Sequence, residues 1–140
     1  MIILDTNVLS ELMRPKPSAS VLAWIARQAE AELSTTAITE AEIFYGIEVL
    51  PRGKRREHLT TAAEAVFTED FAGRVYGFDS AAARAFSRIA SSRRTSGRPI
   101  SQSDAQIAAI AKTRRAKVAT RDVEGFEQCG VDVVDPWNES

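Results

Sequence analysis

The chain has 140 residues, of which 44% are hydrophobic and 26% are charged, and its formal net charge is −1. This size and composition indicate one soluble globular domain, and no apolar run reaches the length of a membrane span. The near-neutral charge argues against non-specific binding to duplex nucleic acid. The single cysteine, Cys129, excludes an internal disulfide and a cysteine zinc cluster. The N-terminus has no signal-peptide pattern, so a cytoplasmic protein is expected.

The first half of the chain alternates short apolar runs with helical patterns. Residues 2–4 are expected to form a strand, followed by a short helix at 7–13 and a second helix at 18–28. A β-branched run at 33–36 predicts the next strand. The helix expected at 37–50 has two apolar sides, which indicates burial on both sides or an interface.

The same alternation continues to the C-terminus. Further helices are expected at residues 54–67, 79–92 and 101–115, with a short helix or turn at 123–128. Further strands are expected at residues 75–78, 117–120 and 131–134, and the polar stretch 93–99 is expected to be a loop. Regular alternation predicts an α/β domain spanning 1–140, with a parallel sheet of four to five strands and helices on both faces.

Four acidic residues are predicted to meet at one edge of this sheet. Asp5 follows the first strand directly, and Asp122 follows the strand at 117–120. Glu42 and Asp104 lie near the starts of two helices beside these strand ends. Parallel strands present their carboxyl ends to the same edge, where open α/β sheets place their active sites.

Crowded carboxylates repel one another unless a cation neutralises them. No lysine or arginine recurs at each of these four positions to serve as a partner, so we expect the acids to hold a hard divalent cation such as Mg²⁺. Such a site can activate water and stabilise charge during displacement at a phosphodiester. Supporting hydrogen bonds are expected from Thr6, Asn7 and Thr120.

Each acid also has a simpler explanation when taken alone. Asp104 fits a first-turn acid that favours the helix dipole, and Asp122 fits a cap of the turn after it. Glu42 stands three residues after Thr39, the spacing of a capping box. Asp5 is the hardest to explain this way, because an unpaired acid behind a buried strand is costly. One metal centre explains the four together better than four separate structural roles.

Other polar residues are interpreted as structural. His58 lies in a charged stretch and is expected at the surface, which argues against a histidine-based nuclease or a serine triad. Glu11 and Asp135 are expected at the surface or in turns, and Asp79 as a helix cap. Three basic clusters are interpreted as solvated helix ends or, alternatively, as phosphate contacts beside the acidic centre. They are Arg52, Lys54, Arg55 and Arg56; Arg93, Arg94 and Arg98; and Lys112, Arg114, Arg115 and Lys117.

Several segments, in this order and spacing, resemble PIN-domain toxins of the VapC/FitB type. They are residues 1–10, 33–42 with Gly46, 104–109 and 118–122, and the trailing 133–137 is similar to the FitB-like branch. The resemblance covers essentially the whole chain and implies one PIN domain over residues 1–140.

The resemblance also implies an activity and partners. It implies an Mg²⁺- or Mn²⁺-dependent endoribonuclease, the toxin of a bacterial toxin–antitoxin pair, with the family's acidic quartet at Asp5, Glu42, Asp104 and Asp122. In this picture the three aspartates are metal ligands, and Glu42 holds metal-bound water or a second ion. A homodimer is implied, as is a small antitoxin whose C-terminal segment wraps the toxin. Operator DNA would be bound only through the antitoxin.

Two alternatives and one partner surface remain open at this point. The alternatives are a catalytically silent PIN-fold binding module and a phospho-acceptor signalling domain with Asp79 as acceptor. The partner groove is placed on the helices at 18–28 and 37–50, around Trp24 and Phe44. The competing interpretation is that these aromatic residues are simply core.

Overall fold

The computed structural model describes residues 1–139 as an α/β fold built on five parallel strands. The strands are β1 (Ile2–Leu4), β2 (Leu33–Thr36), β3 (Val75–Tyr76), β4 (Lys117–Ala119) and β5 (Val133–Val134). Their order in the sheet is β3-β2-β1-β4-β5, so β1 lies at the centre. Ile3 pairs with Ser34 on one side and Val118 on the other. The predicted α/β class, parallel pairing and upper strand number are confirmed.

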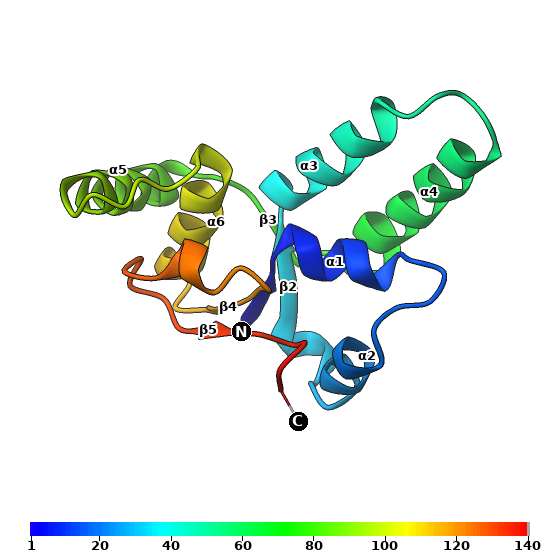
Figure 1. The fold of residues 1–140 in the computed structure, drawn as a ribbon, viewed down its shortest axis with the longest axis horizontal. Coiled ribbons are helices and arrows are strands. Elements are labelled where there is room, and N and C mark those ends of the chain that lie inside the picture. The colour runs from blue at the N-terminus through cyan, green and yellow to red at the C-terminus, as the bar shows by residue number, and fades with distance from the viewer. Residues whose placement is uncertain (140) are drawn as a thin grey trace.

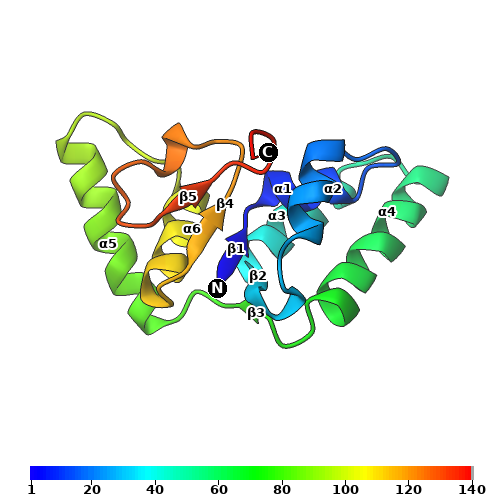
Figure 2. The ribbon, with the colours of Figure 1, turned by 90° about the horizontal axis from the view of Figure 1, so that it is seen from below.

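The α-helices pack on both faces of the sheet (Figures 1 and 2). They are α1 (Thr6–Leu12), α2 (Ala19–Ala26), α3 (Ala37–Glu48), α4 (Lys54–Ala65), α5 (Ser80–Thr95) and α6 (Gln102–Thr113). Figure 2 shows α5 and α6 on one side of the strands and α1 to α4 on the other. No helix in residues 1–139 is both long enough and apolar enough to cross a membrane.

Successive residues of β1 and β4 point alternately into two separate hydrophobic cores. Ile3 and Val118 point into the core beneath α5 and α6, together with Phe126. Their neighbours Leu4 and Ala119 point into the core beneath α1 to α4. Because side chains alternate across a strand, both faces of β1 and β4 are buried. The central strands are therefore held rigidly, and the residues that follow them start from fixed positions.

The predicted start of the loop after α5 is wrong for a reason that bears on the site. The loop expected at 93–99 begins later, because α5 continues to Thr95 and Arg93 is buried rather than solvated. The helix ends where Gly97 adopts φ +76°, a left-handed conformation that suits glycine. Strands β3 and β5 are also shorter than expected, at two residues each.

The caps of two helices are set by single hydroxyls. Thr36 caps α3 by accepting a hydrogen bond from the backbone N–H of Thr39. Ser101 caps α6 by accepting a hydrogen bond from the backbone N–H of Asp104. These caps fix the rotation of both helices and place their first turns at the carboxyl edge of the sheet.

Candidate active site

All four predicted acids line one cavity of about 550 Å³. Asp5 enters it from the end of β1, Glu42 from α3, Asp104 from α6 and Asp122 from the segment after β4. Asp5 is buried, Asp104 is half-buried, and Glu42 and Asp122 are exposed to solvent. The four carboxylates therefore meet at the carboxyl edge of the sheet, as predicted. We call the cavity that they line the carboxylate cavity.

Asp5 is the deepest of the four acids. It caps α1, accepting at Oδ1 from the backbone N–H of Thr6 at 2.8 Å. Its Oδ2 accepts from the hydroxyl of Thr120 at 2.7 Å and from Asn7 Nδ2 at 3.4 Å. The pKa of Asp5 is raised to about 6, mainly by burial. The hydrogen bonds from Thr120 and from the Thr6 backbone lower it in part, and the charges of Asp104 and Glu42 raise it.

Thr120 and Asn7 join the ends of the two central strands. Besides donating to Asp5, Thr120 Oγ1 accepts from the backbone N–H of Asp122 at 3.0 Å and from Asn7 Nδ2 at 3.1 Å. Asn7 Oδ1 accepts from the backbone N–H of Arg121 at 3.2 Å. Both side chains contact the acids or their backbone, as expected of supporting residues.

Glu42 is tied to the same cluster through Thr6. The hydroxyl of Thr6 donates to Glu42 Oε1 at 2.8 Å and lies 3.0 Å from Thr39 Oγ1. Because Thr36 is the cap of α3, Glu42 is not the second half of a capping box that starts at Thr39. Its carboxylate is instead presented to the cavity beside Asp5.

Asp104 lies in the first turn of α6, where the helix dipole favours an acid. Burial is the main cause that raises the pKa of its carboxyl, and the charges of Asp122 and Glu42 act in the same direction. A hydrogen bond with Ser101 and the charge of Arg93 lower it in part. Asp104 therefore stabilises the N-terminus of α6 and also lies close to other acids.

Asp122 combines the two roles proposed for it. Its Oδ1 accepts from the backbone N–H of Gly125 at 3.1 Å, which closes the turn that follows β4. The approach is so close that a Cβ on Gly125 would lie 2.8 Å from Asp122 Cγ. Glycine at position 125 is thus required by the position of the Asp122 carboxylate.

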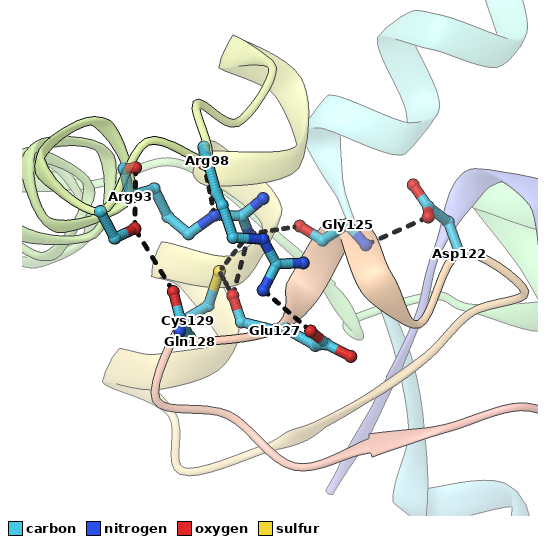
Figure 3. A network of polar contacts seen from close by, with 8 residues as sticks. Arg93, Arg98, Asp122, Gly125, Glu127, Gln128 and Cys129 are labelled. Atoms are coloured by element: carbon cyan, nitrogen blue, oxygen red, sulfur yellow. Dashed lines mark hydrogen bonds and ion pairs between the residues drawn. The ribbon is translucent and has the colours of Figure 1, made fainter.

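Arg93 clamps this turn from the other side (Figure 3). Its Nη1 donates to the backbone carbonyls of Gly125 and Glu127, both at 2.9 Å, and its Nε donates to the carbonyl of Arg98 at 2.6 Å. Nη1 also lies 3.7 Å from Cys129 Sγ. With an exposure of 5%, Arg93 is neither a solvated helix end nor a phosphate contact. The expectation for this member of the basic cluster was wrong.

The donor set fits a hard divalent cation in its chemistry. Carboxylate oxygens are the ligands such cations prefer. None of the four acids takes part in an ion pair with a basic residue of 1–139. Within the same residues, no three side chains of His, Cys, Asp or Glu are close enough together to hold one ion. Mg²⁺ commonly takes only one or two carboxylates and fills its remaining positions with water and phosphate oxygens.

The cavity also has lining residues that were not predicted as site residues. They are Ser10, Glu11, Arg14, Arg121 and Trp137. Glu11, expected at the surface, is buried and accepts from the backbone N–H of Ser18 at 2.8 Å. It also pairs with Arg14 at 3.3 Å. Its place four residues after Asn7, on the same face of α1, is the sequence signal that points to the cavity.

A second hollow, of about 860 Å³, adjoins the carboxylate cavity between α1, α3 and α4. Thr6, Ser10, Arg14 and Glu42 line both. The exposed His58 lines only the second hollow.

The aromatic residues expected to form a partner groove lie elsewhere. Trp24 is only 4% exposed and belongs to the core, and Phe44 packs against Phe67 with ring centroids 5.9 Å apart. The competing interpretation, that these aromatic residues are core, therefore holds for Trp24. Neither Trp24 nor Phe44 lines the second hollow.

The chain is similar to known proteins over almost its whole length. A family model described as the PIN domain matches residues 2–130. The chain is 42% identical over 137 residues to VapC ribonuclease Y4jK of Sinorhizobium fredii, covering 98% of each protein. It is 39% identical over 139 residues to toxin FitB of Neisseria gonorrhoeae, covering 99% of this chain and 100% of FitB.

The fold is likewise close to a solved structure. FitAB bound to an IR36 DNA fragment contains a chain that aligns with a TM-score of 0.93 at 38% identity. The alignment covers 100% of this chain and 98% of that one. Similarity thus extends over the entire sheet and all the elements that carry the four acids.

Proposed function

The chain belongs to the PIN-domain family, and we propose that it is a divalent-metal-dependent endoribonuclease, the toxin of a bacterial toxin–antitoxin pair. The observation that carries the proposal is the carboxylate cavity. Four acids from four elements line it, and none is paired with a basic residue of 1–139. The name of the Sinorhizobium fredii relative, a ribonuclease, agrees with the choice of RNA as substrate.

Asp5, Asp104 and Asp122 would hold Mg²⁺ or Mn²⁺, in part through bound water, because no three of the acids are close enough together to bind one ion directly. Glu42 would hold metal-bound water or a second ion. When bound, such an ion supplies activation of water and neutralises charge that develops on the phosphodiester. The chain's own contribution is to fix the acids. Thr120 holds Asp5 at 2.7 Å and Thr6 holds Glu42 at 2.8 Å, so these two carboxylates are oriented before substrate arrives.

The acids also create the need for a cation. The pKa of Asp5 is raised to about 6 by burial and by neighbouring acids, and that of Asp104 is raised in the same way. A divalent cation would remove this penalty by compensating the buried and crowded charge. We therefore propose Mg²⁺ or Mn²⁺ as the cofactor.

The partner proposed for the chain is a small antitoxin. FitB is named a toxin, and one chain in the structure of FitAB bound to DNA is similar to this chain along its whole length. The second hollow between α1, α3 and α4 is the surface we propose for the antitoxin's C-terminal segment, because it opens beside the carboxylate cavity. A segment lying there would block access to the acids. Operator DNA would be bound through the antitoxin, and the toxin itself would form a homodimer.

The signalling alternative is disfavoured by the placement of Asp79. Its Oδ1 accepts from the backbone N–H of Ala82 at 2.9 Å and caps α5, and Asp79 does not line the carboxylate cavity. The silent binding module differs from the proposal only in activity, so the cleavage test separates the two.

Cleavage of a labelled RNA by the purified chain tests the proposal. We expect cleavage in Mg²⁺ or Mn²⁺, none in EDTA, and loss of cleavage in Asp5→Asn and Asp104→Asn. Glu40→Gln is the matched control, because Glu40 lies on α3 near Glu42 but does not line the cavity. Cleavage that persisted in Asp5→Asn or in EDTA would contradict the proposal. Absence of cleavage by a chain that still binds antitoxin would favour the silent module.

A further inference from the structure

One of the two arginines in the carboxylate cavity has no acidic partner among residues 1–139. Two arginines, Arg14 and Arg121, line the cavity together with the four acids. Arg14 forms an ion pair with Glu11 at 3.3 Å. Arg121 forms no ion pair and no side-chain hydrogen bond with any residue of 1–139, although it borders four acids. Its guanidinium donors are therefore free for a ligand.

Arg121 is held in place by contacts other than ion pairs. Its guanidinium carbon lies 4.8 Å from the ring centroid of Trp137, a cation–π arrangement. Its backbone N–H donates to Asn7 Oδ1, which ties the residue to the hydrogen-bond network of Asp5. A guanidinium stacked on a ring keeps the donors at its edge available for a planar or phosphate ligand.

Trp137 is itself fixed by a local turn. Its backbone N–H donates to Asp135 Oδ1 at 3.0 Å, and Asn138 Nδ2 donates to the other oxygen of the same carboxylate at 2.7 Å. The Trp137 side chain packs against the core beneath α1 to α4. The ring that holds Arg121 is thus anchored to the body of the protein.

We propose that Arg121 is the phosphate-binding residue of this cavity for the RNA backbone, and that Trp137 is the positioning residue that holds it. The inference rests on the proposed ribonuclease function. A wall of four acids repels a polyanion, so a strand can approach only where cations offset that charge. Arg121 is a fixed, unpaired cation at this wall, and guanidinium binds phosphate through paired N–H donors.

The test measures the binding of a labelled single-stranded RNA to the full chain in the absence of metal. Every protein carries Asp5→Asn, which we expect to prevent cleavage of the RNA. In this background we expect Arg121→Ala to weaken binding about tenfold. The slope of log K against log salt should fall by about 0.7, the value for one phosphate contact on a single strand. Arg121→Lys should keep the slope and still weaken binding, because the planar fork and the stacking are lost.

Arg94→Ala is the matched control. Arg94 is an exposed arginine in the last turn of α5 that does not line the cavity, so its removal changes net charge equally. We expect a much smaller loss of affinity and no change in slope. Equal affinity and slope for Arg121→Ala and Arg94→Ala would overturn the inference, as would an Asp5→Asn parent that binds no RNA.

A double-mutant cycle tests the role of Trp137. Trp137→Leu should weaken RNA binding about threefold when Arg121 is present and should have no effect in the Arg121→Ala background. Trp137→Phe, which keeps a ring, should lie between. An equal loss from Trp137→Leu in both backgrounds would show that Trp137 does not act through Arg121.

Failure of this inference can be told from failure of the proposed function. If the wild-type chain cleaves RNA in Mg²⁺ but Arg121→Ala binds RNA like Arg94→Ala, only the role of Arg121 is wrong. If the wild-type chain does not cleave RNA, the ribonuclease function itself is wrong, whatever Arg121 binds.

Discussion

The hydroxyl of Thr120 donates a 2.7 Å hydrogen bond to Asp5 Oδ2, across 115 positions of the sequence. It connects the end of β4 to the end of β1, the two strands that pair at the centre of the sheet. Both residues are buried, so this contact sets the position of the deepest acid in the carboxylate cavity.

Removing the hydroxyl of Thr120 should weaken both the fold and the site. In Thr120→Val we expect a loss of roughly 1–3 kcal/mol of stability, because a charged acceptor loses a buried donor. This hydrogen bond lowers the pKa of Asp5, so the variant should hold Asp5 protonated to higher pH and bind Mn²⁺ more weakly at pH 7. Thr120→Ser, which keeps the hydroxyl, should restore Mn²⁺ affinity. Equal Mn²⁺ affinity in Thr120→Val and wild type would show that the hydrogen bond does not prepare the acid.

Neutralising Asp5 should stabilise the protein in EDTA. The folded-state pKa of Asp5, about 6, lies above its usual value of 3.8. A raised pKa means that the fold is favoured by protonation below about pH 4, and that this advantage is lost as pH rises through about 6. Wild-type stability should therefore fall over that interval, by up to about 3 kcal/mol, since one pKa unit corresponds to 1.36 kcal/mol. Asp5→Asn should be more stable than wild type at pH 7 and show less of this fall. Urea unfolding at pH 4 and pH 7 measures the free energy of unfolding of wild type and of Asp5→Asn. An Asp5→Asn protein less stable than wild type at pH 7 would contradict a cost of burying the charged Asp5 carboxylate.

Gly125→Ala should damage the site more than the fold. The added Cβ would meet the carboxylate of Asp122, which can move aside at small energetic cost because it is the end of a side chain. We expect a fall in RNA cleavage of at least tenfold with less than about 1 kcal/mol of lost stability. Gly46→Ala is the control, because a Cβ there meets nothing within 4 Å and alanine favours a helix. Unchanged cleavage by Gly125→Ala would mean that the position of Asp122 does not matter.

Arg93 should be required for the turn that carries Asp122. In Arg93→Met three backbone carbonyls lose their donor, at Arg98, Gly125 and Glu127. We expect a loss of roughly 3 kcal/mol or more, since each unsatisfied buried acceptor costs about 1–3 kcal/mol. Arg98→Ala is the comparison, because its ion pair with Glu127 is partly exposed and should contribute under 1 kcal/mol. Equal melting temperatures for Arg93→Met and Arg98→Ala would contradict the claim that Arg93 stabilises this turn.

Much of the site could be predicted from local sequence. Asp5 follows an apolar run that can only be a buried strand, and Asp122 follows another, so the parallel sheet brings them to one edge. The polar neighbours Thr6, Asn7 and Thr120 were expected beside them and form the observed hydrogen bonds. Their roles in catalysis stay predictions.

The remaining features depend on contacts between distant segments. Arg93 looks like part of a solvated basic cluster, because two of its three carbonyl acceptors lie more than 30 positions away in a turn with no distinctive sequence. Glu11 is different, because its partners Arg14 and Ser18 are close in sequence and its place four residues after Asn7 already points to the cavity. Trp137 stacks with Arg121 only because β5 brings the C-terminal segment beside the end of β4. Local patterns contain no signal for such pairings.

Binding of Mn²⁺, followed by electron paramagnetic resonance in the absence of RNA, tests the proposed metal centre most directly. We expect saturable binding to the wild-type chain and to the Glu40→Gln control, and a loss of at least tenfold in affinity in Asp5→Asn and in Asp104→Asn. Asp5 and Asp104 line the same cavity from different elements, so one shared site requires both. Equal Mn²⁺ affinity in wild type and both aspartate variants, or no saturable binding to the wild type, would contradict a metal centre formed by these carboxylates.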